Sequence, residues 1–553
     1  MNPASDPAST RNARLGQFAA LLAFLVILFL PTPSDLAPAA QRLAAVGAAM
    51  AILWLTQAVP LGATSLIPVA AFPLLGIQTA DDVSQSYIND SVLLFLGGFV
   101  IALGIERWGL HRRIALHVVR CLGSSPRRIV LGFALATGFL SMWISNTASA
   151  LLMIPIAMAL LRSLEELGSA PEETETARSS LWRPNSFGTA LMLAIAYSAS
   201  LGGMTTLVGT PPSLAFRQIF TATFPEAPPV SAGPWMVSFV PLGLAMILVM
   251  WVLVTIGLKP IPGTESLGRA FFTTRLRALG SPNSGERRMF LVFATTAILW
   301  LTRVPISLTG DPDALFRLPG WGPWFAERLM EFGLSAETAA AMVSDATVAV
   351  LMAVAMFFIP AGRSLPEDPG STKPEKLVSP GRYNLMDWPT ANRLPWEILL
   401  LFGGGFALAG GFAETGLSEW IGQRFAGAFH EQPAWVVVVA TCTLLTFLTE
   451  LTSNTATCNI LLPILGPAAI ELGLDPRLVM VAATISASCA FMLPVATPPN
   501  ALVFGTGRVS VWQMARSGIL LNLIGIVLAT MTVMWLYAPQ VGIDPSVLPE
   551  WAR

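Results

Sequence analysis

Residues 145–148 read Ser-Asn-Thr-Ala, and the same four residues recur at 453–456, 308 positions further along the chain. A second pair follows in the same order, because Thr-Pro-Pro stands at 210–212 and again at 497–499. A glycine-rich pair precedes both, LFLGGF at 94–99 and LFGGGF at 401–406. Three matching signatures in one order predict an internal repeat, with one copy of the same unit in each half of the chain.

The composition places this repeat in a membrane protein. Of the 553 residues, 54% are hydrophobic and only 12% are charged, and the mean hydropathy is +0.64. Soluble proteins carry about 25% charged residues, so a soluble enzyme, a disordered chain and a nucleic-acid-binding protein are excluded. The net charge of −1 gives no argument for a charged partner. Because one membrane-spanning helix needs about 20 apolar residues, the chain is predicted to be an all-α polytopic membrane protein in the lipid bilayer.

Hydropathy predicts eleven membrane-spanning helices and two apolar segments that do not fit single spans. The spans are expected near residues 15–32, 41–60, 62–78, 91–108, 187–220, 235–258, 288–305, 338–360, 396–413, 477–505 and 513–537. The other two segments, near 127–161 and 432–470, carry the Ser-Asn-Thr motifs. A continuous helix over 129–161 would be about 50 Å long, against roughly 30 Å of hydrocarbon. Both segments are therefore predicted to be re-entrant hairpins, each formed by two half-helices that meet at a polar tip.

Basic residues orient the predicted spans. Six Lys or Arg lie in 107–128, six in 259–288 and five in 363–393, whereas the loop 79–90 has none. A cytoplasmic N-terminus puts every basic cluster on one side of the cell (inner) membrane, and the C-terminus is then expected outside. The first apolar segment also admits a signal peptide, since Ala37-Pro38-Ala39 loosely matches a cleavage site. Its apolar stretch is long enough to remain as a helix instead.

The chain is expected to form a single membrane domain over 1–553, because its polar loops are too short to be domains. Its expected parts are an N-terminal segment with the first span at 1–40, a first repeat at 41–258, a cytoplasmic linker at 259–287 and a second repeat at 288–537. Five spans, counting the first glycine-rich helix itself, separate the start of that helix from the start of its counterpart. Since five is odd, the two copies enter the membrane in opposite directions. Such an inverted repeat is characteristic of secondary transporters.

Each Thr-Pro-Pro motif is expected to interrupt the helix that follows a hairpin. Paired prolines remove two backbone donors and force the preceding residue out of helical geometry. The freed carbonyl oxygens can bind a hard cation, while half-helix N-termini at the hairpin tips offer N–H groups to an anion. A lone Ser-Asn-Thr motif would more simply bond its own backbone or join two helices. Its duplication beside the proline breaks favours a binding site between the repeats.

Two charged residues near the motifs have more than one interpretation. Glu450, three residues before Ser453, is either a proton carrier or a structural residue beside the hairpin, and the matching position in the first half is Met142. Arg217 follows the first Thr-Pro-Pro motif and can attract anions towards an outer vestibule, an interpretation that the sequence does not favour.

In these motifs the sequence resembles the divalent anion/sodium symporter family, the carriers of di- and tricarboxylates and sulfate. The resemblance runs from about residue 40 to 537 and is carried by residues 145–147, 453–455, 209–212 and 496–500. It implies eleven spans and two opposed hairpins in each protomer. It also implies a scaffold part that forms a homodimer, and a transport part that moves through the membrane like an elevator.

The resemblance further implies two sodium sites and one substrate site. The first sodium site would be formed by Ser141, Ser145, Asn146 and Gly209, and the second by Thr449, Ser453, Asn454 and Ala496, some through backbone carbonyls. The substrate carboxylates would meet the hairpin tips at Ser145, Asn146, Thr147, Ser453, Asn454 and Thr455, with Thr210, Thr497 and Pro498 nearby. One residue departs from the family pattern, because Ser213 stands where Asn usually follows the first Thr-Pro-Pro. The departure bears on packing or cation geometry behind the first site.

We therefore expect sodium-coupled uptake of a C4-type dicarboxylate such as succinate, with Na⁺ as the coupling ion. Two separate tips suit two separated carboxylates better than a compact sulfate. The nearest alternative is a sodium-independent dicarboxylate exchanger, followed by a sulfate or tricarboxylate carrier of the same family. Outside this class, an anion channel would need a continuous pore. An enzyme is not expected, because the apolar segments lack the His and acidic clusters that such chemistry uses.

Overall fold

The computed structural model describes residues 7–123, 125–167, 187–258, 264–307, 317–362, 383–426 and 432–552. In the first half the helices are α1 (Pro7–Phe29), α2 (Pro38–Thr56), α3 (Leu61–Thr64), α4 (Ile67–Leu74), α5 (Ala80–Gln85), α6 (Asp90–Arg107), α7 (Leu110–Leu122), α8 (Pro126–Ser141), α9 (Asn146–Leu167), α11 (Phe187–Gly203), α12 (Pro211–Thr223) and α13 (Ala232–Thr255). Residues 1–6 of the expected N-terminal segment and 259–263 of the expected linker lie outside the described residues.

The second half continues with helices and two short antiparallel strand pairs. Its elements are α14 (Thr264–Ala278), α15 (Ser284–Leu301), β1 (Ile306–Ser307), β2 (Arg317–Leu318), α16 (Trp321–Glu331), α17 (Ala336–Ala341), α18 (Asp345–Phe358), β3 (Pro360–Gly362), β4 (Tyr383–Asn384), α19 (Trp388–Ala391), α20 (Trp396–Thr415), α21 (Leu417–Ala426), α22 (Ala434–Leu448), α23 (Asn454–Glu471), α24 (Pro476–Ala487), α25 (Pro498–Gly505), α26 (Val511–Thr532), a π-helical turn (Val533–Tyr537), α27 (Ala538–Gln540) and a 3₁₀ turn (Glu550–Ala552). β1 pairs with β2, and β3 with β4.

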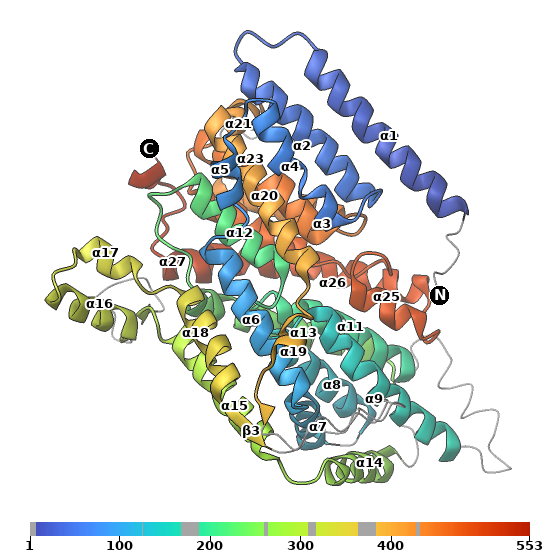
Figure 1. The fold of residues 1–553 in the computed structure, drawn as a ribbon. Helices are drawn as coiled ribbons and strands as arrows, with labels where there is room; N and C mark the ends of the chain where they lie inside the picture. The colour runs from blue at the N-terminus through green and yellow to red at the C-terminus, as the bar shows by residue number, and fades with distance from the viewer. Residues whose placement is uncertain are drawn as a thin grey trace.

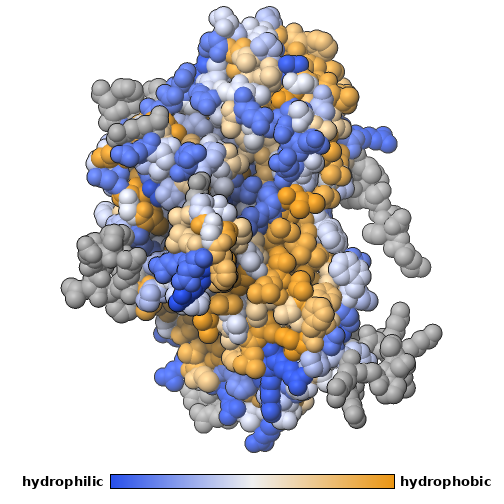
Figure 2. All heavy atoms as spheres, turned by 60° about the vertical axis from the view of Figure 1, so that its left-hand side comes forward, coloured by the Kyte–Doolittle hydropathy of each residue, from blue (hydrophilic) through white to orange (hydrophobic). Residues whose placement is uncertain are grey.

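The described residues make a helical, polytopic membrane protein, as the composition predicts. Six helical segments are long and apolar enough to cross a membrane, and six shorter apolar helices accompany them. Hydrophobic residues gather over the lower half of the face shown in Figure 2, with hydrophilic residues below them. The count of eleven spans, the inverted repeat and the orientation of the termini stay predictions.

All four predicted interruptions occur at the expected motifs. α8 ends at Ser141 and α9 begins at Asn146, so the first Ser-Asn-Thr motif lies at a break. The second lies likewise between α22 and α23, which begins at Asn454. α11 and α12 are separated at residues 204–210, and α24 and α25 at 488–497, directly before the paired prolines. Proline cannot donate to the preceding turn, which explains why a helix can begin there and not continue through.

Helices of the two halves pack across one another around these breaks. α12 contacts α23 and α24, which belong to the second half of the chain, while α25 contacts α9 and α11 of the first half. Figure 1 shows α12 close to α20 and α23, and α25 beyond the end of α11. The half-helices that begin at the motifs are therefore packed against the opposite half.

One expected span is not a single continuous helix. Residues 62–78 form two short helices, α3 and α4, because Pro68 has no N–H to donate to the preceding turn. The carbonyl oxygen of Ser65, between these helices, accepts a hydrogen bond from the Tyr87 hydroxyl at 2.5 Å. Gly404 of α20 lies against the same carbonyl, since a Cβ there would be 2.5 Å from the oxygen. The glycine-rich run thus serves close helix packing.

Candidate functional site

Each helix that begins after a break has a Ser or Thr of a motif directly before its first residue. The Ser145 hydroxyl accepts a hydrogen bond from the Ala148 amide at 3.2 Å, at the beginning of α9. Ser453 caps α23 through the Ala456 amide, and Thr497 caps α25. Thr210 precedes α12 without a side-chain cap. Four helix N-termini, two from each half, thus begin at the predicted motifs. Those of α9 and α23 offer backbone N–H groups beside the positive end of a helix dipole, whereas α12 and α25 each begin with two prolines, which have no N–H.

The first half brings a hydroxyl, an amide oxygen and a carbonyl oxygen together. The fully buried Ser141 hydroxyl lies 2.7 Å from Asn146 Oδ1 and 2.6 Å from the Ala199 carbonyl oxygen. A hydroxyl has one proton, so it can donate fully to only one of these two acceptors. We call these three oxygens the first oxygen cluster; it is richer in lone pairs than in hydrogens.

Two glycines bring further carbonyls to the first oxygen cluster. A Cβ on Gly203 would lie 2.2 Å from Asn146 Oδ1 and 3.1 Å from the Gly209 carbonyl oxygen. A Cβ on Gly209 would lie 2.5 Å from the Gly203 carbonyl oxygen and 2.8 Å from that of Ser141. A side chain at Gly203 would displace the Asn146 amide, and one at Gly209 would require the backbone to shift. The absence of side chains here lets several backbone oxygens approach one another.

The second half repeats the arrangement with different residues. The Thr449 hydroxyl lies 2.5 Å from Asn454 Oδ1 and 2.9 Å from the Ala487 carbonyl oxygen. We call these three oxygens the second oxygen cluster. In both halves the hydroxyl stands five residues before the asparagine, and the carbonyl belongs to the helix that precedes the proline break. Ala496, within that break, donates its amide to the Leu493 carbonyl at 3.2 Å.

Glu450 binds the backbone of the second break. Its carboxylate, in a side chain that is 3% exposed, accepts hydrogen bonds from the amides of Phe491 at 2.7 Å, Met492 at 2.9 Å and Leu493 at 3.1 Å. A fourth donor, Asn522 Nδ2 of α26, lies 2.7 Å away. Of the two sequence interpretations, this geometry favours the structural one, because every donor is an N–H that a carboxylate can satisfy.

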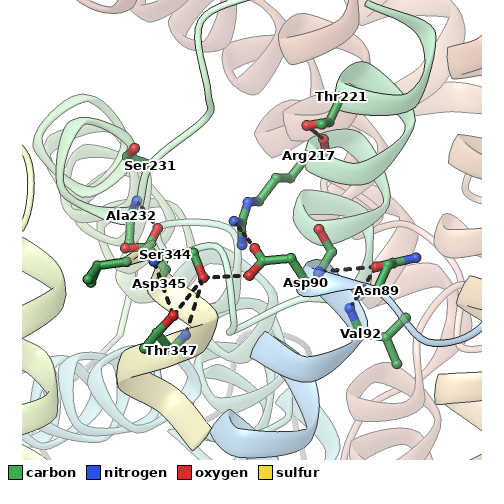
Figure 3. A network of polar contacts seen from close by, with 12 residues as sticks. Asn89, Asp90, Val92, Arg217, Thr221, Ser231, Ala232, Ser344, Asp345 and Thr347 are labelled. Atoms are coloured by element: carbon green, nitrogen blue, oxygen red, sulfur yellow. Dashed lines mark hydrogen bonds and ion pairs between the residues drawn. The ribbon is translucent and has the colours of Figure 1, made fainter. Parts of the chain in front are cut away.

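Arg217 forms an ion pair with Asp90, and its buried Nη1 has no hydrogen-bond partner among the described residues. Its Nη2 lies 2.7 Å from Asp90 Oδ2, and Asp90 Oδ1 accepts from the Ser344 hydroxyl at 2.5 Å (Figure 3). A neighbouring pair joins Arg303 to the fully buried Asp345 at 2.5 Å. Sequence reasoning missed this network, although an acid inside the apolar segment 338–360 was a visible signal.

The remaining predicted residues differ in their surroundings. The hydroxyls of Thr147 and Thr455 make no hydrogen bond to another described residue, and Pro498 is exposed at the start of α25. Asn500 donates its Nδ2 to the carbonyls of Ala490 and Leu493, at 3.1 and 3.0 Å. Ser213, at the corresponding place in the first half, is fully buried and its hydroxyl has no partner among the described residues.

The oxygens at the two clusters are hydroxyl, amide and backbone carbonyl oxygens. In the part of the chain that the structure describes, no group of three His, Cys, Asp or Glu side chains could hold a metal ion. Neutral oxygens around unwound backbone suit an alkali cation, whereas N-termini of half-helices suit carboxylates. The arrangement offers both kinds of site within the same breaks.

Comparison with known proteins gives matches over nearly the whole chain. The model of the family described as the sodium:sulfate symporter transmembrane region matches residues 11–542. The sodium-dependent dicarboxylate transporter SdcS of Staphylococcus saprophyticus is 36% identical over 549 residues, or 98% of this chain and 95% of the relative. The protein of the same name from Staphylococcus aureus is 36% identical over 528 residues, covering 95% and 91%.

Two solved structures are similar at low sequence identity. The YdaH transporter of Alcanivorax borkumensis is 14% identical, with a TM-score of 0.47 over 96% of this chain and 97% of that one. MtrF of Neisseria gonorrhoeae is also 14% identical, with a TM-score of 0.49 and 96% of each chain covered.

Proposed function

Because this chain belongs to the sodium:sulfate symporter family, we propose that it carries C4-type dicarboxylates such as succinate into the cell together with Na⁺. The family is one of transporters, and the chain is a multi-pass membrane protein of that family. The names of the relatives, sodium-dependent dicarboxylate transporters at 36% identity, support both the coupling ion and the substrate class.

The observation that carries the proposal is the pair of oxygen clusters. In each, one hydroxyl proton faces two acceptors, so a cation would satisfy lone pairs that no hydrogen reaches. We infer one sodium site at Ser141, Ser145, Asn146 and Gly209, and another at Thr449, Ser453, Asn454 and Ala496.

A single carboxamide connects each cation to the substrate. Oδ1 of Asn146 and of Asn454 faces its oxygen cluster, while Nδ2 has no partner among the described residues and can donate to a carboxylate. The hydroxyls of Thr147 and Thr455 and the N-termini of α9 and α23 add neutral donors. With Thr210, Thr497 and Pro498 nearby, each tip would hold one carboxylate while Na⁺ offsets its charge. Loss of the cation would then release the amide and weaken substrate binding.

The wider architecture belongs to the same proposal. We propose eleven spans with two opposed re-entrant hairpins, a cytoplasmic N-terminus and an outer C-terminus. The repeats 41–258 and 288–537 would be inverted. The scaffold part of each protomer would form a homodimer and stay fixed, while the transport part, which contains the breaks, would move through the membrane like an elevator. The cross-packing of α12 with α23 and of α25 with α9 supports a site shared by both repeats.

Uptake into proteoliposomes tests the function. Labelled succinate, citrate and sulfate are offered with an inward gradient of sodium or of choline, and sodium is varied at fixed substrate. The expected result is sodium-dependent succinate uptake with a sigmoidal dependence on sodium, because two cations accompany one anion. Equal uptake in choline that needs internal dicarboxylate would indicate an exchanger instead. Preference for sulfate or citrate would change the substrate class, and turnover at channel rates would contradict a carrier.

A further inference from the structure

The backbone of the break at 488–497 is held by two side chains. Glu450 accepts from the amides of residues 491–493, and Asn500 donates to the carbonyls of Ala490 and Leu493. Unwound backbone inside a protein must find such partners, because no water or helix satisfies it there. The carboxylate provides the larger share, since it satisfies three consecutive N–H groups that a continuous helix would have used.

Glu450 is also adjacent to a member of the second oxygen cluster. Thr449 contacts the Ala487 carbonyl at the end of α24, and Glu450 contacts the amides a few residues further on. Two consecutive residues of the α22–α23 turn thus bind the two sides of the point where α24 unwinds. A shift of the carboxylate would move the backbone that carries the Ala487 and Ala496 carbonyls.

The first half performs the same task in another way. Thr206, within the first break, donates its hydroxyl to the Met142 carbonyl at 2.6 Å and accepts from the Gly209 amide at 3.0 Å. Met142 follows Ser141 as Glu450 follows Thr449. In each half, the residue after the cluster hydroxyl binds the break, but only the second half uses a charge.

The charge on Glu450 has no basic partner. Among the described residues, no Lys, Arg or His forms an ion pair with it, and its four donors are uncharged amides. A buried charge without a countercharge is costly unless it is strongly hydrogen-bonded or compensated by a bound ion. A cation at the adjacent oxygen cluster would provide that compensation.

We propose that Glu450 is the positioning residue of the second oxygen cluster: it holds the break at 488–497 open and supplies the negative charge that favours a cation there. The inference rests on the proposed function for the cation and deepens it. It makes the two cation sites unequal, because the first site is positioned by a neutral hydroxyl and the second by a carboxylate.

Glu450→Gln, Glu450→Asp and the matched control Glu414→Gln test the proposal in purified protein. Glu414 is an exposed acid at the end of α20. Glutamine turns one acceptor into an NH₂ group that faces N–H donors, so the amides of residues 491–493 should exchange hydrogen for deuterium at least about ten-fold faster. The half-saturating sodium concentration for uptake should rise about ten-fold, with less change in the maximal rate. Aspartate keeps the charge, so Glu450→Asp should bring both the exchange rate of residues 491–493 and the half-saturating sodium concentration part of the way back to the wild-type values.

The readouts separate positioning from a general structural role. Amides of the first break, residues 204–209, serve as the internal reference and should exchange as in the wild type. Unchanged exchange at 491–493 in Glu450→Gln, or a lower maximal rate with unchanged sodium dependence, would overturn the proposal. The proposal would also be overturned if Glu450→Gln lost only the pH dependence of uptake, because Glu450 would then be a proton carrier. If Glu450→Gln does not fold, Glu450→Asp is compared with the wild type: its shorter side chain should raise the exchange rate of residues 491–493 and the half-saturating sodium concentration in the same direction but by less, and no change in either would overturn the proposal.

The same experiment distinguishes this proposal from the proposed function. If the wild type shows no sodium-dependent uptake of any dicarboxylate, the proposed function fails. The exchange rates of residues 491–493 still report whether Glu450 holds the break. Two results together would keep the backbone role of Glu450 and remove its role in cation binding: faster exchange of residues 491–493 in Glu450→Gln, and no slowing of that exchange by sodium in the wild type.

Discussion

Ser141 and Asn146 are joined across the first break by a contact of 2.7 Å between hydroxyl and amide oxygen. Thr449 and Asn454 repeat the contact in the second half at 2.5 Å, with the same spacing of five residues. The hydroxyl changes from serine to threonine, so what is kept is the oxygen and not the side chain. Repetition of a contact with different residues is expected where the oxygen has a ligand to bind.

Thr449→Val should weaken the response to sodium. Valine has nearly the shape of threonine but no oxygen, so the second oxygen cluster loses one ligand while packing is kept. A lost hydrogen-bonding group of this kind costs about 1–3 kcal/mol, and the half-saturating sodium concentration should rise about ten-fold. The control is Thr443→Val on the preceding helix, α22, where the exposed Thr443 hydroxyl bonds only the Val439 carbonyl. Equal sodium dependence in both variants would remove Thr449 from the site.

Asn146→Ala and Asn454→Ala should each lower the affinity for both sodium and substrate. The amide oxygen of each residue lies at an oxygen cluster and its nitrogen can reach a carboxylate, so one truncation removes both interactions. Charge-assisted hydrogen bonds are worth about 1.5–3 kcal/mol, which corresponds to about ten-fold or more in affinity. Exposed Asn392→Ala is the matched control. Normal transport by both site variants would make the Ser-Asn-Thr tips structural.

The positions of the helix breaks could be predicted from the sequence, because proline and the uncharged length of the segments act locally. The start of α12 at Pro211 follows from the backbone chemistry of proline, and the break before Asn146 follows from an uncharged segment longer than the membrane is thick. Duplication of the motifs made the two oxygen clusters predictable as a pair. Ser141 and Thr449 could be named only through family resemblance, since nothing local marks them.

Long-range partners could not be predicted. Asn522 reaches Glu450 over 72 residues, and Asp90 reaches Arg217 over 127 residues. Only packing of the whole chain decides such pairs. For this reason the role of Glu450 stayed open in the sequence, and the pairing of Arg217 was not foreseen. The split of the expected span 62–78 was missed because its apolar run hides the effect of Pro68.

Asn500→Ser should destabilise the protein, because it leaves two break carbonyls without their donor. Asn500 is fully buried and bonds the carbonyls of Ala490 and Leu493. Buried carbonyls without partners cost about 1–3 kcal/mol, so the midpoint of thermal unfolding should fall by a few degrees. Ser213→Asn is the reciprocal variant in the first half, where the buried serine hydroxyl has no described partner. An unchanged midpoint in Asn500→Ser would show that the carbonyls find other donors.

His111 should make the protein less stable in acid. Burial lowers the pKa of His111 from 6.5 to about 4, although its ring nitrogen lies 3.0 Å from the Ile105 carbonyl oxygen. A folded pKa below the unfolded one gives stability at neutral pH that is lost as pH falls from 6.5 towards 4. By about pH 5 the loss should reach about 2 kcal/mol. The unfolding midpoint of His111→Gln should vary less with pH than that of the wild type, and parallel curves would refute the assignment.

Transport should follow the dianion fraction of the substrate as the external pH changes. The proposed ligands are hydroxyls, amides and helix N-termini, so each negative charge on the substrate strengthens binding and sodium offsets that charge. Protonation of one carboxylate would set an O–H group against an N–H donor. Initial rates of succinate uptake between about pH 5.5 and about pH 8 should therefore fall in acid, with the KM changing more than the maximal rate. Asp387 stays ionised over this range: burial alone would raise its pKa, but its hydrogen bonds with Arg107 and Thr390 lower it to about 2. Uptake by His111→Gln separates substrate titration from loss of stability, because the substrate effect must persist there. Uptake that rises in acid without sodium stimulation would instead indicate proton coupling.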